Sequence, residues 1–157
     1  MQSVTIRPAG PADIPDMSRL WYEKMVLQQQ FDRRFALLPD SQARWMAEVE
    51  GWLADPHCAI FVAEREDDVV GYIVAWIQAG PPGLTPEQLG VVTDLTVDTH
   101  RQQGGAGRLL LQPVREWLKE RRVAHLIAYV PRRLAVEQAF WRALGATEWL
   151  DALWLKL

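Results

Sequence analysis

Hydrophobic and polar residues recur along this chain with two different periods. Apolar residues at every second position are typical of a β-strand, and apolar residues three and four positions apart mark one face of a helix. Alternation predicts strands at residues 4–7 and 147–155. Apolar or β-favouring runs predict strands at residues 60–64, 69–78, 91–97 and 124–130. The helical spacing predicts helices at residues 14–25, 41–55 and 136–144, and a longer helix that begins at a glycine cluster near residue 105 and ends near residue 121. The order β-α-α-β-β-β-α-β-α-β predicts a mixed α/β domain.

The sharpest turn in this pattern lies between the fourth strand and the long helix. Gly104, Gly105 and Gly107 cluster where the helical pattern begins. A helix N-terminus presents backbone N–H groups without intrahelical partners, and glycine lets a bulky anion approach them closely. The turn therefore predicts a phosphate-binding cradle. Its spacing matches neither the P-loop nor the dinucleotide-binding glycine motif, and a turn that only closes a β-α connection is the alternative interpretation.

The composition narrows the class of protein further. With 157 residues, 49% hydrophobic and 24% charged, the chain is expected to fold as one globular domain. A formal net charge of -3 gives no general reason to expect nucleic acid as a partner. Cys58 is the only cysteine, which excludes an intrachain disulfide and is typical of the reducing cytoplasm. His57, His100 and His125 lack the spacing of metal ligands, and the chain has neither a leader nor an apolar run of about 18 residues, so neither a metal site nor a membrane partner is expected.

Several segments of the chain together resemble one protein family. Residues Arg101–Ala106 match the R/Q-x-x-G-x-G/A element with which GNAT N-acetyltransferases bind the pyrophosphate of acetyl-CoA. The resemblance covers the chain from Val4 to about Leu155, and it implies one acetyltransferase-like domain over residues 1–157. The other matching segments are Ile6-Arg7-Pro8 followed by Asp13, Val69–Ile73, Leu95–Asp98 and Phe140–Ala146.

The resemblance also implies the fold and the place of acetyl-CoA. A GNAT-like single domain has a mixed central sheet that is splayed between strands 4 and 5 and flanked by about four helices. The pantetheine arm lies in that opening, where the backbone of Leu95, Thr96 and Val97 is expected to bind it. The arginines at the two ends of the glycine turn either add charge to the pyrophosphate site or are simply solvated. The residues expected to bind the pyrophosphate are Arg101, Gln102, Gln103, Gly104, Gly105, Ala106, Gly107 and Arg108.

The catalytic residues are less well defined by the resemblance. In this family the acetyl group passes directly from the thioester to an amine, which must lose a proton. Asp94 stands where family members frequently have a carboxylate facing the cleft, and Tyr129 where some carry a glutamate base. The alternatives are a charge at the sheet edge for Asp94 and a packed side chain for Tyr129. The tyrosine that often protonates the leaving thiolate is replaced by Trp141, and the asparagine seven residues earlier by Leu134. An indole does not release a proton near neutral pH, so the acid is not identified.

The irregular segment at residues 28–39 is expected to line the acceptor side. Arg33 and Arg34 can pair with a substrate carboxylate, while Phe31 and Phe35 either pack on the apolar part of the substrate or face the core. The sequence therefore predicts a cytoplasmic, acetyl-CoA-dependent N-acetyltransferase that acts on a primary amine of a small molecule, with a homodimer left open. The alternatives are a non-catalytic acyl-CoA-binding module and a binding protein for another nucleotide.

Overall fold

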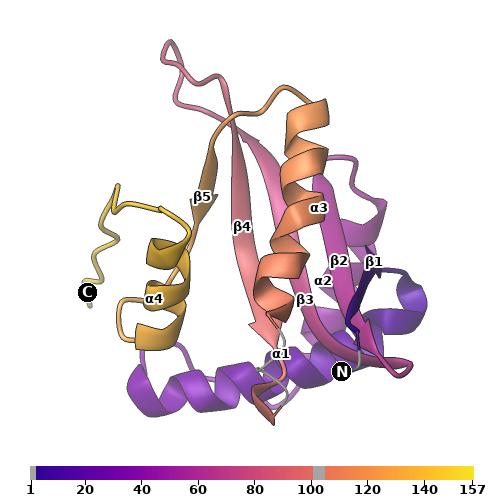
Figure 1. The fold of residues 1–157 in the computed structure, drawn as a ribbon. Coiled ribbons are helices and arrows are strands. Elements are labelled where there is room, and N and C mark those ends of the chain that lie inside the picture. Colours follow the sequence, from indigo (N-terminus) through magenta and orange to yellow (C-terminus); the bar gives the residue numbers. More distant parts are fainter. Residues whose placement is uncertain (1–2, 101–104) are drawn as a thin grey trace.

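The computed structural model describes residues 3–100 and 105–157, which form a five-stranded sheet with helices on both faces (Figure 1). Neighbouring strands are antiparallel from the first to the fourth, and the fifth is parallel to the fourth, so the predicted mixed α/β fold is confirmed. The strands lie across the sheet in chain order: β1 (Thr5–Pro8), β2 (Cys58–Arg65), β3 (Asp68–Ala79), β4 (Gln88–Val97) and β5 (Leu126–Ala128). The helices are α1 (Ile14–Phe31), α2 (Ser41–Ala54), α3 (Ala106–Glu120) and α4 (Ala135–Ala143), and a 3₁₀ turn, η1 (Pro11–Asp13), precedes α1.

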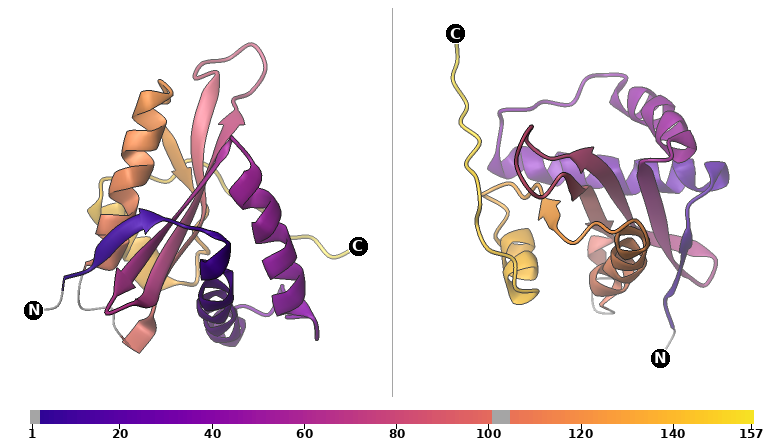
Figure 2. Two further views of the ribbon diagram at one scale, coloured as in Figure 1. Left: turned by 90° about the vertical axis from the view of Figure 1, so that its right-hand side faces the viewer. Right: turned by 90° about the horizontal axis from the view of Figure 1, so that it is seen from above.

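Two hydrophobic cores hold the helices against opposite faces of the sheet. α1 and α2 pack on one face, where Met17 and Tyr72 are fully buried. α3 packs on the other face through Leu110 and Val114. Figure 2 shows these two layers on either side of the twisted sheet. β3 lies between both cores, and its residues 69–75 are buried without a break because both of its faces are covered.

β4 and β5 part after a short stretch of pairing. Parallel pairs join residues 90–92 of β4 to β5, and the N–H of Tyr129 donates to Val92 O at 3.2 Å. The register of β4 against β3 then shifts, because Thr93 is an extra residue in β4. Such a bulge bends and twists its strand. β4 continues along β3 as far as Val97 while β5 ends, so the predicted splay between the fourth and fifth strands is confirmed.

Two predicted elements have different bounds in the structure. α1 continues to Phe31, so the first residues of the segment predicted to be irregular, 28–39, form the last turn of the helix. β5 is shorter than the strand predicted at 124–130, because its partner β4 leaves it after Val92. The bounds of β5 thus depend on where β4 leaves it, which the local pattern does not contain.

The prediction of a final strand at residues 147–155 is wrong. These residues form no strand, and they leave α4 in a direction away from β5 (Figure 2). An alternating pattern produces a strand only where a neighbouring edge supplies backbone partners. The segment is held instead by side chains, with Trp154 in edge-to-face contact with Phe35 at 5.2 Å and Asp151 paired with Arg132. Its exposed apolar residues are Trp149, Leu150, Leu153, Trp154 and Leu155.

An ion-pair network ties β1 to the start of α1. Arg7 in β1 donates from two nitrogens to the Asp13 carboxylate, at 2.8 Å each, and to Glu64 in β2 at 2.7 Å. Asp13 also accepts the N–H of Gly10 at 2.8 Å. The hydrogen bonds from Arg7 hold the pKa of the Asp13 carboxyl below its usual range. Arg7 and Asp13, which belong to the family-like opening segment, thus have a structural role.

Asp13→Asn is expected to destabilise the fold by about 1–2 kcal/mol at pH 7, because it removes the charge that accepts these hydrogen bonds. The folded-state pKa of Asp13 lies below its unfolded value, so its contribution is complete above about pH 5 and is lost as the pH falls through the folded-state value. Urea unfolding should therefore show a difference between wild type and variant that shrinks towards about pH 2. Glu48→Gln, on the exposed face of α2, is the control. A difference that does not depend on pH would contradict this account.

Candidate active site

The open part of β4 presents the backbone of two residues. The N–H of Asp98 donates to Val70 O at 2.8 Å, so the backbone of Asp98 faces β3. Backbone groups alternate in direction along an antiparallel strand, and Thr96 therefore also faces β3. Leu95 and Val97 point to the opposite edge, which β5 has left. Of the three residues predicted to bind a pantetheine arm through the backbone, Leu95 and Val97 present theirs at this edge.

α3 begins with a glycine in the left-handed region. Gly105 precedes the helix with φ 68°, a conformation that residues with a side chain rarely adopt. A Cβ on Gly105 would have no described neighbour within 4 Å, so the space in front of the helix is open on that side. The first N–H groups of a helix lack intrahelical acceptors and lie at the positive end of its dipole. The segment from Gly105 to Gly107, followed by the exposed Arg108, therefore fits a phosphate group. The other predicted pyrophosphate residues, Arg101, Gln102, Gln103 and Gly104, lie outside the described residues.

Asp94 accepts hydrogen bonds from three side chains on the α1–α2 side of β4. Lys24 Nζ in α1 donates to Asp94 Oδ1 at 3.0 Å, and Thr96 Oγ1 donates to the same oxygen at 2.9 Å. The hydroxyl of Tyr72 in β3 donates to Oδ2. Burial, and then the charge of Asp94, raises the pKa of Tyr72 well above its usual value, so the hydroxyl keeps its proton. A carboxylate has about four acceptor positions, which leaves one for water or a ligand.

Lys24 joins this carboxylate to a second one. Its Nζ also lies 3.3 Å from Glu137 Oε1 in α4, and it donates to Leu95 O at 3.1 Å. Burial alone would lower the pKa of the Lys24 ammonium, but the charges of Asp94 and Glu137 outweigh burial, and the pKa is raised. Residues of α1, β4 and α4 therefore meet around the Lys24 ammonium, and Tyr72 of β3 joins them through Asp94. The polar network, as it is termed below, consists of Lys24, Tyr72, Asp94, Thr96 and Glu137.

Two residues singled out in the sequence lie apart from these contacts. Tyr129 follows β5, and its side chain is exposed. Trp141 is buried in the core on the α3 side of the sheet. The residue that replaces the family's tyrosine therefore fills the core.

The segment expected to line the acceptor side carries arginines in several environments. Arg34 pairs with Asp32 at 2.8 Å, and Arg133, at the entry to α4, donates to Phe31 O at 3.1 Å. Arg33 and Phe35 are exposed. These groups surround the C-terminal end of α1.

Lys24 and Glu137 are site residues that the sequence analysis above does not predict. Lys24 follows Leu20 by four residues and Met17 by seven, so it continues the buried face of α1. A lysine on such a face is the signal that could have identified it. Glu137 lies in the first turn of α4, where a carboxylate is ordinary because it complements the helix dipole. Its role becomes visible only when α4 is placed beside α1.

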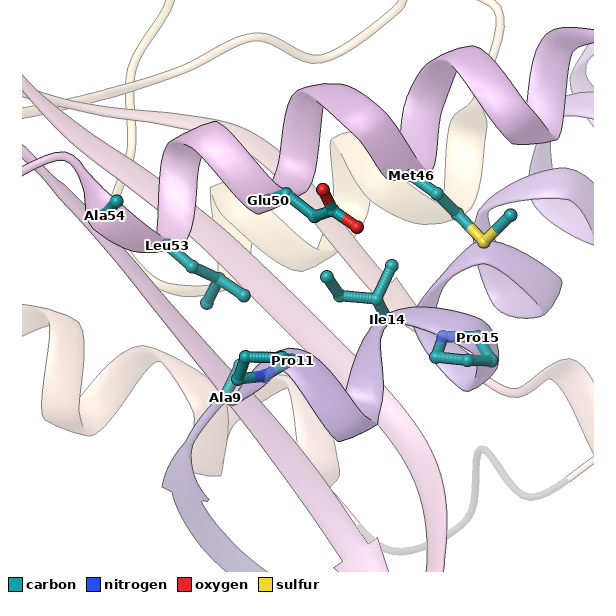
Figure 3. Close-up of a pocket in the computed structure, with 8 residues that line it drawn as sticks. All are labelled: Ala9, Pro11, Ile14, Pro15, Met46, Glu50, Leu53 and Ala54. Carbon is teal, nitrogen blue, oxygen red and sulfur yellow. The ribbon is translucent and has the colours of Figure 1, made fainter.

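A separate hollow of about 580 Å³ lies between the start of α1 and α2 (Figure 3). Ile14, Met46 and Leu53 contribute apolar walls, and Glu50 is the charged residue of its lining. It shares no residue with the polar network. Among the described residues, no group of three or more His, Cys, Asp and Glu side chains is arranged to hold a metal ion. No helix in the described part of the chain is long and apolar enough to cross a membrane.

Known acetyltransferase sequences are similar to this chain. The model of the acetyltransferase (GNAT) family matches residues 21–146. A mycothiol acetyltransferase of Acidothermus cellulolyticus is 31% identical over 131 residues, which cover 74% of this chain and 39% of that protein. The chain thus spans about two fifths of the length of this curated relative.

Solved structures share the fold. The aminoglycoside 6'-N-acetyltransferase AAC(6')-IG of Acinetobacter haemolyticus matches with a TM-score of 0.78 at 18% identity, over 98% of this chain and 97% of that chain. A predicted acetyltransferase of Clostridium acetobutylicum, solved with acetyl-CoA, matches with a TM-score of 0.78 at 14% identity, over 98% of this chain and 96% of that chain. At these identities the likeness establishes the fold alone. The family match extends over most of the sequence, and this chain therefore belongs to the GNAT acetyltransferase family.

Proposed function

We propose that this protein is an N-acetyltransferase that transfers the acetyl group of acetyl-CoA directly to a primary amine of a small molecule. The observation that carries the proposal is the open edge of β4, which leads to the start of α3 and has the polar network on its α1–α2 side. Membership in the GNAT family supports acetyl transfer. Similarity to a mycothiol acetyltransferase and to an aminoglycoside N-acetyltransferase favours a small-molecule acceptor.

The acyl donor would lie along the open edge of the sheet. Backbone groups of Leu95 and Val97 can pair there with the amides of a pantetheine arm, as a neighbouring strand would. The pyrophosphate would lie at the start of α3, on the backbone N–H groups of Ala106 and Gly107. Arg108, which is exposed one residue further along the helix, would add positive charge.

The reaction needs a neutral amine and a stabilised leaving thiolate. The amine nitrogen forms a bond to the thioester carbon, the carbon–sulfur bond breaks with its electron pair on sulfur, and the proton lost by nitrogen balances the thiolate. Asp94 is the proposed proton acceptor, through a water molecule at the position that Lys24, Thr96 and Tyr72 leave free. Tyr129 is the proposed alternative, since its side chain is exposed where β5 ends.

Two measurements test this function. Tryptophan fluorescence should respond to acetyl-CoA and CoA but not to NAD, and thiol release should require both acetyl-CoA and an amine from a panel. Burial raises the pKa of the Cys58 thiol to about 12, so this cysteine should add little background to a thiol assay. Binding of acetyl-CoA without turnover of any amine would favour a non-catalytic acyl-CoA-binding module, the alternative left open by the replacement of the family's tyrosine by Trp141. Absence of CoA binding would contradict both functions.

Gly105→Asn is expected to weaken acetyl-CoA binding about tenfold, or by about 1.4 kcal/mol, with little loss of stability. Asparagine tolerates the left-handed region better than most residues, and its side chain would enter the open space in front of α3. Gly83, with φ 75° and equally open surroundings, offers a matched control. Gly83→Asn should change the Tm by a similar amount and leave the Kd for acetyl-CoA unchanged. An unchanged Kd in Gly105→Asn would mean that the pyrophosphate binds elsewhere.

Asp94→Asn is expected to reduce the turnover of alkylamines more than that of α-amines. At pH 7, deprotonating an alkylamine of pKa about 10.4 costs roughly 4–5 kcal/mol, whereas an α-amine of pKa about 8 costs about 1.4 kcal/mol. A positioned base contributes about a hundredfold to ten-thousandfold in rate, so its loss should be largest for the alkylamine. Comparing kcat for two acceptors in one variant cancels any disturbance caused by loss of the ion pair with Lys24. Equal losses for both classes would indicate a structural role for Asp94.

A further inference from the structure

One ammonium group lies between two carboxylates at the open edge of β4. Lys24 Nζ is 3.0 Å from Asp94 Oδ1 and 3.3 Å from Glu137 Oε1. The side chains of Lys24, Asp94 and Glu137 are 17%, 15% and 29% exposed, so all three are largely withdrawn from water. The hydrogen bond from Lys24 to Leu95 O places the ammonium on the open edge itself. With both carboxyls ionised, the cluster has an excess of one negative charge.

We propose that Lys24 is a positioning residue, whose ammonium keeps Asp94 and Glu137 ionised together and holds both at the edge where the acceptor amine enters. This inference rests on the proposed function and deepens it, because the excess negative charge would attract the ammonium form of the acceptor. Lys24 acts through the two carboxylates and does not touch the reacting atoms.

The need for a counter-charge follows from the position of the two carboxylates. Two carboxylates that share one site repel each other, and one of them takes up a proton at a higher pH than an isolated carboxyl would. The other groups that contact Asp94 are the hydroxyls of Tyr72 from β3 and Thr96 from β4, and neither carries a charge. Among the described residues in contact with the pair, Lys24 is therefore the cation that offsets the repulsion.

Lys24 also connects α4 to the rest of the structure. Figure 1 shows α4 above the C-terminal half of α1, on the side of β5 that faces away from β4. The ion pair between Lys24 and Glu137 joins the two helices, and the hydrogen bond from Arg133 to Phe31 O joins them at a second point. Substitution of Lys24 could therefore reduce activity in two ways. It removes the positive charge beside the two carboxylates, and it removes a contact between α1 and α4. The test must separate these causes.

If Lys24 acts through its charge, its loss should change the pH dependence of kcat/KM. If it only connects α1 to α4, its loss should leave that pH dependence unchanged. In Lys24→Met, the acid limb of kcat/KM for an alkylamine should move up by about one pH unit or more, which is about a tenfold loss on the acid side of the limb. Lys24→Arg keeps the charge and should keep the limb close to that of wild type. Arg19→Met removes a cation of the same helix from an exposed ion pair with Glu23, and as the matched control it should leave the limb unchanged.

A second substitution distinguishes charge from connection. Adding Glu137→Gln to Lys24→Met removes the repulsion, so the acid limb should return towards its wild-type position. The contact between α1 and α4 stays absent in the double variant, so a mechanical loss would not be repaired. An unshifted limb in Lys24→Met, or a shift that the double variant retains, would overturn the proposal.

Thermal stability provides a readout that does not depend on turnover. Without Lys24, the repulsion should raise the pKa of one carboxyl in the folded state of Lys24→Met. Such a carboxyl stabilises the fold fully below its unfolded-state pKa of about 4, and this stabilisation is lost as the pH rises through its folded-state pKa. The Tm deficit of the variant should therefore grow between about pH 4 and pH 7, and the double variant should abolish most of that growth. If the wild type turns over no amine, the proposed function fails, and this experiment still decides the role of Lys24. A Tm deficit that does not depend on pH would overturn that role.

Discussion

The parting of β4 from β5 after Val92 is the constraint on which the site depends. Backbone N–H and C=O groups withdrawn from water require partners, and β4 keeps those on its β3 side as far as Val97. On the other side the pairing ends with β5, which leaves the backbone of Leu95 and Val97 without a neighbouring strand. Lys24 supplies a partner for Leu95 O. An extended ligand can use the remaining groups of this edge as a new strand would, because they already point in one direction and need no rearrangement.

Close packing of α3 against the sheet puts the helix near this opening. A Cβ on Gly90 would lie 2.6 Å from a methyl group of Leu118, so glycine lets α3 approach β4 at the point where β5 is still paired. A Cβ on Gly71 would lie 2.9 Å from Thr96 O, so glycine also allows β3 to follow the open part of β4 closely. The two glycines therefore let α3 and β3 both lie close against β4. α3, whose N-terminus is the positive end of its dipole, and the open edge of β4 belong to one packed unit.

The sequence predicted the parts of this unit whose signal is local. The unbroken apolar run at residues 69–75 marks a strand covered on both faces, and the spacing of Leu110, Val114 and Leu118 marks the buried stripe of α3. The glycine cluster before the long helix is also a local signal, and Gly105 does precede α3 in the left-handed region that favours glycine. Its place in an anion cradle stays a prediction. Residues 147–155 alternate as a half-buried strand would, but they form no strand because no sheet edge lies beside them. Periodicity describes which face of a segment is apolar, and only the tertiary structure provides the partner.

The carboxylate partners of Lys24 come from distant segments of the chain, so the local sequence does not identify them. On the sequence, Lys24 is a charge in an amphipathic helix, and such a charge is normally solvated. Its spacing from Met17 and Leu20 places it on the buried face instead, where an unpaired ammonium would be costly. That cost must be offset by anions from elsewhere in the chain, and β4 and α4 supply them as Asp94 and Glu137. A basic residue at a core position of a predicted helix therefore predicts a carboxylate partner in a distant segment. The identity of that partner depends on topology, because a single pair of charges does not determine which elements meet.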